Sequence, residues 1–467
     1  MLTLWFLAGP RPAWAAVPAA GSVADPQAPG PSIASDPAST AKRPPRPAGP
    51  VRVVGHSLAD DNGPFLGLGV SYFTALSRCK QDRARLESDL AFLAKQGFNY
   101  YRMLSMVGYH QAWDGLEIAP VTFTNRVGKR VEAWPDYSQQ LAQLIDLAFD
   151  KHGLRTQITI FADAQLMPEK PARLEHMRAL LANVIRGREH KIMLLEVANE
   201  AWQNGFPGAQ GVADLREFAA YLGAHTQIPV AITSNHDGEH GFDAVYAGSA
   251  ADLATFHFSR DRGPDDGWQP VYDCWRLGER PGFPPVVSNE PIGPGSSVTS
   301  ERDPLRLVMA AAFAYVAKLP AYVFHSEAGV FGKTRFEQTP AIDLFGRLLE
   351  LLPADLPNWK RTDGKEPASP FTVFAGGHSN LYCNEIASAP DGCLRNTGSR
   401  KGDRFVCVPI GIRPGGLELE ARQQLEFTAS DPLTGKVVRA GTLEAGARVK
   451  LPAAPGALII QGKLLQR

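Results

Sequence analysis

The sequence has no excess of charge of either sign. Its 467 residues include 48 acidic and 48 basic side chains, and the formal net charge at pH 7 is zero. Nucleic-acid-binding proteins normally carry a basic excess, and so do proteins that bind anionic membrane surfaces. The charge balance therefore argues against both kinds of partner. A membrane span is equally unsupported, because no apolar run approaches the roughly 20 residues that a bilayer-crossing helix needs.

Cysteine is scarce, with five residues in the whole chain. Cys383 and Cys393 flank a loop that contains Pro and Gly, and this spacing would allow a local disulfide in an oxidising compartment. Separate buried thiols are the alternative. No Cys-x-x-Cys pair and no Cys/His spacing of the zinc-binding kind occurs. We therefore expect neither a metal nor a cofactor.

The first 50 residues do not have the composition of a folded domain. Residues 1–15 contain a short apolar core, and Ala13-Trp14-Ala15 fits the small-x-small pattern of a signal-peptide cleavage site. We expect a signal peptide there and a secreted or periplasmic protein; a fortuitous apolar start is the alternative. Residues 16–50 are rich in Ala, Pro, Ser and Gly, which predicts a linker that buries too little apolar surface to order itself.

Strand-like and helix-like segments alternate through residues 51–352. The predicted strands are 65–70, 98–104, 154–161, 192–197, 229–233, 253–258, 285–288 and 321–324. The predicted helices are 83–95, 135–152, 172–186, 212–222, 305–318 and 341–352. Eight such units over about 300 residues fit an α/β fold of the (β/α)₈ TIM barrel type. A doubly wound open sheet is the alternative, and the absence of a Gly-x-Gly-x-x-Gly loop after the first strand weakens it.

The pattern changes in residues 353–467, where short strands are separated by Gly, Pro and Asp turns. The predicted strands are 371–374, 405–412, 424–429 and 457–460. This pattern is typical of a small all-β domain, and we expect a linker followed by a sandwich-like C-terminal domain packed on the barrel. Glycan binding and a purely structural role are both compatible with such a domain, and we favour the structural role.

Two of the predicted barrel strands end in the same dipeptide. The fourth strand runs into Asn199-Glu200 and the seventh into Asn289-Glu290. A third copy, Asn384-Glu385, has no apolar strand before it and shows how often the pair arises by chance. Catalytic groups of barrel enzymes lie at the carboxyl ends of the strands, and glycosidic-bond hydrolysis needs two carboxylates. Glu200 and Glu290 are therefore the candidate catalytic residues.

In these features the chain resembles the clan A glycoside hydrolases, the retaining group that includes the cellulase and mannanase families. In that clan the acid/base glutamate follows an asparagine at the end of strand four, and the nucleophile ends strand seven. The resemblance implies these roles for Glu200 and Glu290. Residues 96–102 resemble the clan's second strand, whose arginine, here Arg102, supports the nucleophile. His257 matches a strand-six position where the clan often carries His or Tyr.

The chemistry explains why these residue types are needed. An ionised Glu290 would attack the anomeric carbon, and a protonated Glu200 would donate to the leaving oxygen and then deprotonate a water. This requires the carboxyls to lie about 5–5.5 Å apart. Arg102 would stabilise the anion, and Asn199 would donate to the sugar 2-hydroxyl. The alternatives are an Arg that binds backbone carbonyls, an Asn that caps a loop and, for His257, a core histidine.

Further residues near strand ends are candidates for substrate binding. Sugar faces stack on flat rings, so Tyr72 after strand one, Tyr109 after strand two and Trp202 after Glu200 are candidates for a carbohydrate cleft. Each of them is alternatively a ring packed under a loop. His236 ends strand five and would reach either the substrate or the acid/base.

One feature departs from the clan's pattern. The clan usually carries a tryptophan at the end of strand eight, where this sequence has Phe324-His325-Ser326-Glu327. The exact family therefore stays open, and Glu327 becomes a third candidate carboxylate. A metal-assisted hydrolase that uses His236, His257, His325 and Glu327 is a further alternative, which the lack of paired ligand spacing disfavours.

The sequence thus predicts a monomeric retaining glycoside hydrolase that acts on a β-linked oligo- or polysaccharide. A barrel that binds carbohydrate without cleaving it is the alternative from another class, and the presence of both carboxylates and Arg102 speaks against it. The sugar, the linkage and the choice between endo and exo action depend on loop shape, which resemblance of fold does not supply.

Overall fold

The computed structural model describes most of the chain after residue 45. The described residues are 46–108, 117–125, 128–234, 241–257, 274, 277–278, 280–291, 293–295, 300–362, 370–375, 378–381, 395–412, 416–452 and 456–465. The predicted signal peptide, most of the predicted linker and the Cys383–Cys393 pair lie outside them. Within the described part, Cys79, Cys274 and Cys407 are buried.

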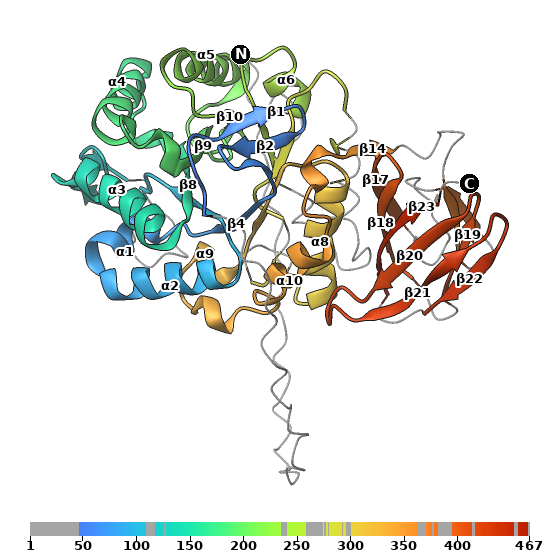
Figure 1. Cartoon of the computed structure of the whole chain (residues 1–467). Helices are drawn as coiled ribbons and strands as arrows, with labels where there is room; N and C mark the ends of the chain where they lie inside the picture. Colours follow the sequence, from blue (N-terminus) through green and yellow to red (C-terminus); the bar gives the residue numbers. More distant parts are fainter. Residues whose placement is uncertain are drawn as a thin grey trace, which may run out of the picture. The chain divides into compact units, whose positions relative to one another are not determined.

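Eight parallel strands form a nearly closed barrel, as the sequence predicted (Figure 1). In chain order they are β4 (Gly67–Ser71), β5 (Tyr100–Leu104), β8 (Arg155–Phe161), β9 (Ile192–Ala198), β10 (Val230–Thr233), β11 (Ala254–Phe256), β12 (Val286–Ser288) and β13 (Ala321–Phe324). From β4 to β10 and from β11 to β13, each strand pairs with the next one in sequence, and β13 pairs with β4. The β10 and β11 strands are the two ends of this order, and they contact each other where the barrel closes. The strands that end in Asn-Glu are therefore the fourth and the seventh.

Alternate side chains of each strand point into the barrel or out toward the helices. On β9, Leu194 belongs to the cluster inside the barrel, while Leu195 and Val197 join the larger core beneath the helices. The strand is buried on both faces, which explains its almost continuous apolar sequence. Glu196 has the same orientation as Leu194, so a carboxylate points into the barrel.

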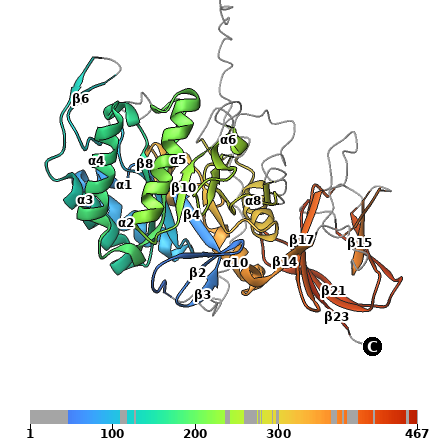
Figure 2. The same ribbon diagram turned by 90° about the horizontal axis from the view of Figure 1, so that it is seen from above.

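Helices cover the outside of the barrel, and α1 to α5 lie around its strands in both views (Figures 1 and 2). The α-helices are α1 (Ala75–Gln81), α2 (Arg83–Lys95), α3 (Tyr137–Asp146), α4 (Lys170–Leu180), α5 (Gly208–His225), α6 (Phe242–Tyr246), α8 (Pro304–Val316), α9 (Glu327–Val330) and α10 (Leu344–Leu351). The α3 and α4 helices continue as π turns, which accounts for the longer predicted segments. None of the described helices has both the length and the apolarity that a bilayer crossing requires.

A small antiparallel sheet precedes the barrel. It consists of β1 (Arg52–Val54), β2 (Ser57–Asp60) and β3 (Gly63–Phe65), and a turn at Asp61 and Asn62 joins β2 to β3. Leu58 of this sheet packs with residues inside the barrel, and Asp60 pairs with buried Arg155 at the first residue of β8, 2.9 Å away. The sheet thus covers the amino ends of the strands and leaves their carboxyl ends for the site.

The C-terminal region is a two-sheet sandwich, as predicted. One antiparallel sheet has the order β14 (Lys360–Thr362), β17 (Arg395–Lys401), β18 (Arg404–Ile410), β23 (Ile459–Leu464), β20 (Leu425–Ser430) and β21 (Val437–Leu443). The other has the order β16 (His378–Leu381), β15 (Phe371–Ala375), β19 (Leu417–Ala421) and β22 (Arg448–Leu451). Apolar side chains from both sheets form one shared core between them.

The β18 strand is buried on both of its faces. Phe405 and Cys407 point into the sandwich core, whereas Val406 and Val408 belong to the barrel's core cluster. The neighbouring strand β17 adds a hydrogen bond from Ser399 Oγ to the carbonyl of Val316 in α8, at 2.8 Å. This contact explains why α8 is apolar around its whole circumference, since a helix of that kind must be covered on every side.

Candidate active site

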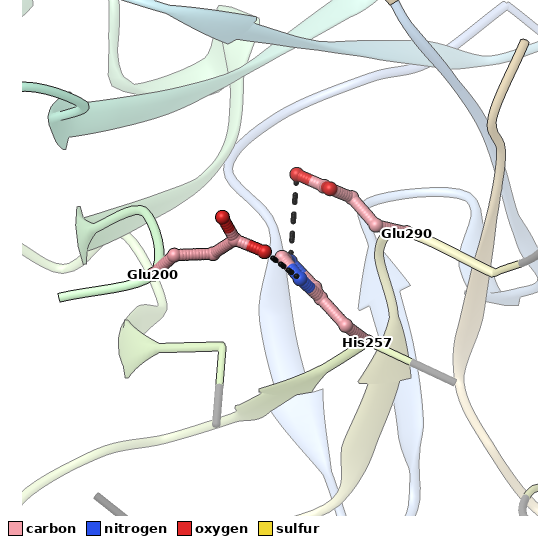
Figure 3. Close-up of side chains that lie close together, drawn as sticks. All are labelled: Glu200, His257 and Glu290. Carbon is pink, nitrogen blue, oxygen red and sulfur yellow. Dashed lines mark hydrogen bonds and ion pairs between the residues drawn. The ribbon is translucent and has the colours of Figure 1, made fainter. Parts of the chain in front are cut away.

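The two predicted catalytic carboxylates converge at the carboxyl ends of β9 and β12. One oxygen of Glu200, one oxygen of Glu290 and one ring nitrogen of His257 all lie within 4.8 Å of one another. Figure 3 shows the imidazole between the two carboxyl groups. Residues 90 positions apart in the chain meet here because parallel barrel strands deliver their carboxyl ends to the same face. The predicted pairing of Glu200 with Glu290 agrees with this geometry.

His257 follows β11 and contacts both carboxylates through opposite ring nitrogens. Its Nδ1 lies 3.1 Å from Oε1 of Glu200, and its Nε2 lies 3.4 Å from Oε1 of Glu290 (Figure 3). The ring is largely buried. His257 therefore belongs to the converging group, because both of its ring nitrogens face carboxylates.

Arg102 of β5 lies within the barrel, in contact with Glu290. It also pairs with Glu196 at 2.9 Å and donates to Oδ1 of Asn199 at 2.7 Å. The guanidinium is fully buried; burial opposes its charge, but the carboxylates of Glu196 and Glu290 outweigh that cost and raise the pKa of Arg102 above its usual value. Its partners are side chains of the site, rather than the backbone carbonyls of the alternative interpretation.

Glu196 is a site residue that the sequence reasoning missed. Its buried carboxylate accepts hydrogen bonds from Thr159 Oγ1 at 2.6 Å and from Asn289 Nδ2 at 2.8 Å, in addition to the contact with Arg102. Ser234 Oγ adds a fourth contact at 3.2 Å. The sequence signal that could have identified Glu196 is that it is the single charged residue inside an otherwise apolar strand. Glu196 holds both Arg102 and the residue before Glu290 in place.

The backbone at Glu200 has a left-handed conformation, with φ of 38°. This conformation costs a non-glycine residue on the order of 1–3 kcal/mol and persists only where neighbours hold it. Asn204 does so, because its Nδ2 donates to the carbonyls of Asn199 at 2.8 Å and Glu200 at 3.4 Å. Gln203 Nε2 donates to Oε2 of Glu200 at 2.5 Å, and Thr233 Oγ1 accepts from the Ala201 amide at 3.3 Å. None of these roles was predicted.

The end of β13 contributes a second imidazole where the clan carries tryptophan. Nε2 of His325 lies 3.7 Å from Oε2 of Glu290, and its Nδ1 lies 2.8 Å from Ser71 Oγ at the end of β4. His325 is buried. Glu290 thus has Arg102 and His257 on one carboxylate oxygen and His325 near the other.

The structure contradicts one predicted substrate contact, and two other predicted contacts lie outside the described residues. Tyr72 is fully buried, and its hydroxyl donates to Asp89 of α2 at 2.6 Å. It points outward because the preceding residue points inward, so it presents no ring face to a sugar and the prediction is wrong. Tyr109 and His236 lie outside the described residues. Trp202, directly after the Glu200 turn, is partly exposed, as stacking on a sugar requires.

The converging cluster has its own positive charge. Three ligand-type side chains close together raise the question of a metal ion, but the buried Arg102 guanidinium already contacts Glu290 and compensates its charge. Arg102 thus supplies a positive charge beside the converging carboxylates. Glu327, half-buried at the start of α9, does not belong to the converging group.

Comparison with known proteins gives the fold a context. No protein-family model matches the sequence, and no curated protein matches it. A solved structure described as a glycoside hydrolase covers 90% of this chain and 98% of its own, at a TM-score of 0.60 and 13% identity. A glycoside hydrolase of family 5 from Bacteroides vulgatus ATCC 8482 covers 89% and 93%, at a TM-score of 0.51 and 14% identity. These likenesses show the predicted fold, a (β/α)₈ barrel followed by antiparallel sheets, and leave the exact family open.

Proposed function

We propose that this protein is a retaining glycoside hydrolase that cleaves β-linked oligo- or polysaccharides. The observation that carries the proposal is the convergence of Glu200 and Glu290, with oxygens within 4.8 Å, at the carboxyl face of the barrel. Retaining enzymes hold their carboxyls about 5–5.5 Å apart, whereas inverting enzymes need about 6.5–9.5 Å to admit a water. The short separation supports double displacement.

Glu290 is the proposed nucleophile. Its carboxylate contacts the fully buried Arg102, which keeps it ionised and fixes the direction of attack. In the first step one of its oxygens forms a bond to the anomeric carbon while the bond to the leaving oxygen breaks. The Glu196 carboxylate also pairs with Arg102. This second ion pair fixes the position of the guanidinium between the two carboxylates.

Glu200 is the proposed acid/base. It gives a proton to the leaving oxygen in the first step, and in the second step it takes one from the water that attacks the glycosyl-enzyme. Gln203 and the strained turn hold its carboxyl toward Glu290. The carboxyl group of Glu200 therefore needs no reorientation before the proton transfer.

Asn199 and Trp202 are the proposed contacts to the sugar. Asn199 uses its Oδ1 to accept from Arg102, so its Nδ2 is the end that donates to the 2-hydroxyl, where a hydrogen bond strengthens in the transition state. The partly exposed ring of Trp202 provides a flat face beside Glu200.

The stereochemical outcome tests this proposal. A panel of chromogenic β-glycosides and plant and bacterial polysaccharides identifies a substrate, and proton NMR then follows the anomeric signals of the first product. We expect the β-anomer to appear first and the α-anomer to arise only by mutarotation. An α-anomer formed first would show inversion, and no turnover of any panel member would favour a binding protein.

Export is a second part of the proposal. The composition of residues 1–15 supports a cleaved signal peptide, and a secreted or periplasmic location is where extracellular polysaccharide is met. Expression of the full chain in a bacterial host, followed by N-terminal sequencing of the periplasmic protein, should give Ala16 as the first residue. A product that keeps Met1 and stays in the cytoplasm would contradict export.

A further inference from the structure

Glu200 and His257 share a hydrogen bond that holds a single proton. The bond joins Oε1 of Glu200 to Nδ1 of His257 at 3.1 Å (Figure 3). An ionised carboxylate and an unprotonated ring nitrogen are both acceptors, so the contact requires a proton on one of the two atoms. When Nε2 also carries a proton, {Glu200–H, neutral His257} and {Glu200⁻, His257–H⁺} have equal proton counts, so the shared proton is the same one whichever atom carries it.

The surroundings of Glu200 place this proton on the Oε1 side. The other oxygen, Oε2, accepts a hydrogen bond from the amide of Gln203 at 2.5 Å. An oxygen that accepts from an amide N–H is the acceptor end of the carboxyl group. The acidic proton of Glu200 therefore lies on Oε1, toward His257.

The second ring nitrogen of His257 faces the nucleophile. Its Nε2 lies 3.4 Å from Oε1 of Glu290, which the proposed mechanism needs in the ionised form. A carboxylate favours a proton on the nitrogen that faces it, because that nitrogen then becomes a donor. The imidazole thus holds a proton on Nε2 toward Glu290 and shares the other proton with Glu200 through Nδ1.

From these contacts we infer that Glu200 and His257 act as one acid/base pair, which holds the reaction's proton in the Oε1–Nδ1 hydrogen bond. The inference rests on the proposed retaining mechanism. In glycosylation a bond forms from Glu290 to the anomeric carbon, the bond to the leaving oxygen breaks, and the pair's proton moves from Oε1 to that oxygen. In deglycosylation water oxygen bonds to the carbon, the ester bond to Glu290 breaks, and a water proton returns to the pair.

Other charged groups face the pair from the neighbouring strands, and they stay the same when His257 is replaced. Arg102 of β5 contacts Glu290, and Glu196 of β9 lies on the far side of Arg102. His325, after β13, faces the other oxygen of Glu290. Replacing His257 also removes the contact of its Nε2 with Glu290, so only the alkaline limb of the pH profile reports on the pair.

Two substitutions at His257 distinguish the roles of its two ring nitrogens. His257→Phe removes both, whereas His257→Gln keeps an N–H near the Nε2 position and loses the Nδ1 acceptor. The pH profile of kcat/KM reports the groups of the free enzyme. We expect its alkaline limb to move to lower pH by about one unit in both variants, because both lack the Nδ1 atom that shares the proton. kcat should fall further in His257→Phe. An alkaline limb that stays in place in both variants would overturn the inference.

A second measurement needs no turnover. ¹⁵N-histidine NMR of the full protein follows the titration of His257, whose signals are those missing in His257→Gln. In Glu200→Gln the midpoint of this titration should fall by about one unit or more, because the protonated ring loses its carboxylate partner. An unchanged midpoint would overturn the pair even in an active enzyme. Failure of the proposed function appears separately, as wild-type protein that turns over no glycoside.

Discussion

Glu196 shows how much of the site depends on a residue that does not touch the reacting groups. Its carboxylate is buried in the fourth barrel strand and binds Arg102, Thr159 and Asn289. A buried carboxylate with four contacts is costly to disturb, because each partner left without it is a buried polar group without a hydrogen bond. The positions of Arg102 and Glu290 both follow from this arrangement.

Replacing Glu196 with Gln should therefore destabilise the protein. The amide keeps the shape but removes the charge opposite Arg102, and it offers donors where Thr159 and Asn289 already donate. We expect a loss of about 1–3 kcal/mol in the free energy of unfolding, measured by urea titration. Glu350→Gln, at an exposed position of α10, is the matched control and should change it by less than about 0.5 kcal/mol. Equal values for the two variants would contradict the role given to Glu196.

The residues that the sequence identified and those it missed differ in a physical way. Glu200, Glu290 and Arg102 were predictable because a strand end or a known strand pattern places them. The roles of Gln203 and Asn204 depend on a left-handed turn, which no periodicity reveals. Tyr72 was misplaced because a position next to a strand end does not say which way the side chain points.

At the scale of elements, the local sequence predicted segments well where the signal was strong. The α2 helix and the β13 strand have the predicted bounds. Predicted helices 135–152 and 172–186 end as π turns, and predicted strand 253–258 is described as only three residues in β11. The contact of the N-terminal sheet with the inside of the barrel depends on long-range packing, which a short segment does not encode.

The α4 helix contains a histidine that links stability to pH. His176 packs beside the rings of Tyr137 and Phe161, and burial lowers its pKa to about 4. Between pH 6.5 and 4 the unfolded chain binds a proton that the folded chain does not, so stability falls as the pH falls through this window. The 2.5-unit difference from the usual 6.5 corresponds to about 3 kcal/mol.

Comparison with a variant tests this linkage. His176→Phe keeps an aromatic ring in the same apolar site and removes the titrating group. Urea unfolding between pH 7 and pH 4 should show a smaller loss of stability in the variant than in the wild type. The difference should open below pH 6.5. Parallel curves for the two proteins would mean that His176 stays neutral in the unfolded chain as well, or that it is exposed.

At the scale of the whole molecule, the C-terminal sandwich completes the covering of a barrel helix. Val406 and Val408 of β18 belong to the barrel's core cluster, and α8 is buried on every side. The described residues of the sandwich expose one large apolar side chain, Val437, and no aromatic platform for a glycan. The structural role that the sequence favoured for this domain fits these contacts.

A pair of matched substitutions tests that role. Val408→Asp places a charge in the barrel's core cluster, to which β18 contributes, and an unpaired carboxylate there costs several kcal/mol, on the order of 3–5. Val437→Asp makes the same chemical change at a side chain that is 58% exposed. Thermal unfolding should show a large loss of Tm for the first variant and almost none for the second, and the proposed glycosidase activity should be lost along the same curve. A barrel that keeps its Tm and activity in Val408→Asp would show that it does not depend on the sandwich.

The most direct test of the account is to trap the nucleophile. A 2-deoxy-2-fluoro glycoside of the sugar that the enzyme cleaves, with an activated leaving group, slows hydrolysis of the covalent intermediate more than its formation. Mass spectrometry of the digested protein should find one glycosyl group on Glu290 and none in Glu290→Gln, which should also lose at least about 10⁴-fold in kcat. A label on Glu200 or Glu327, or turnover with no covalent adduct, would contradict the assignment.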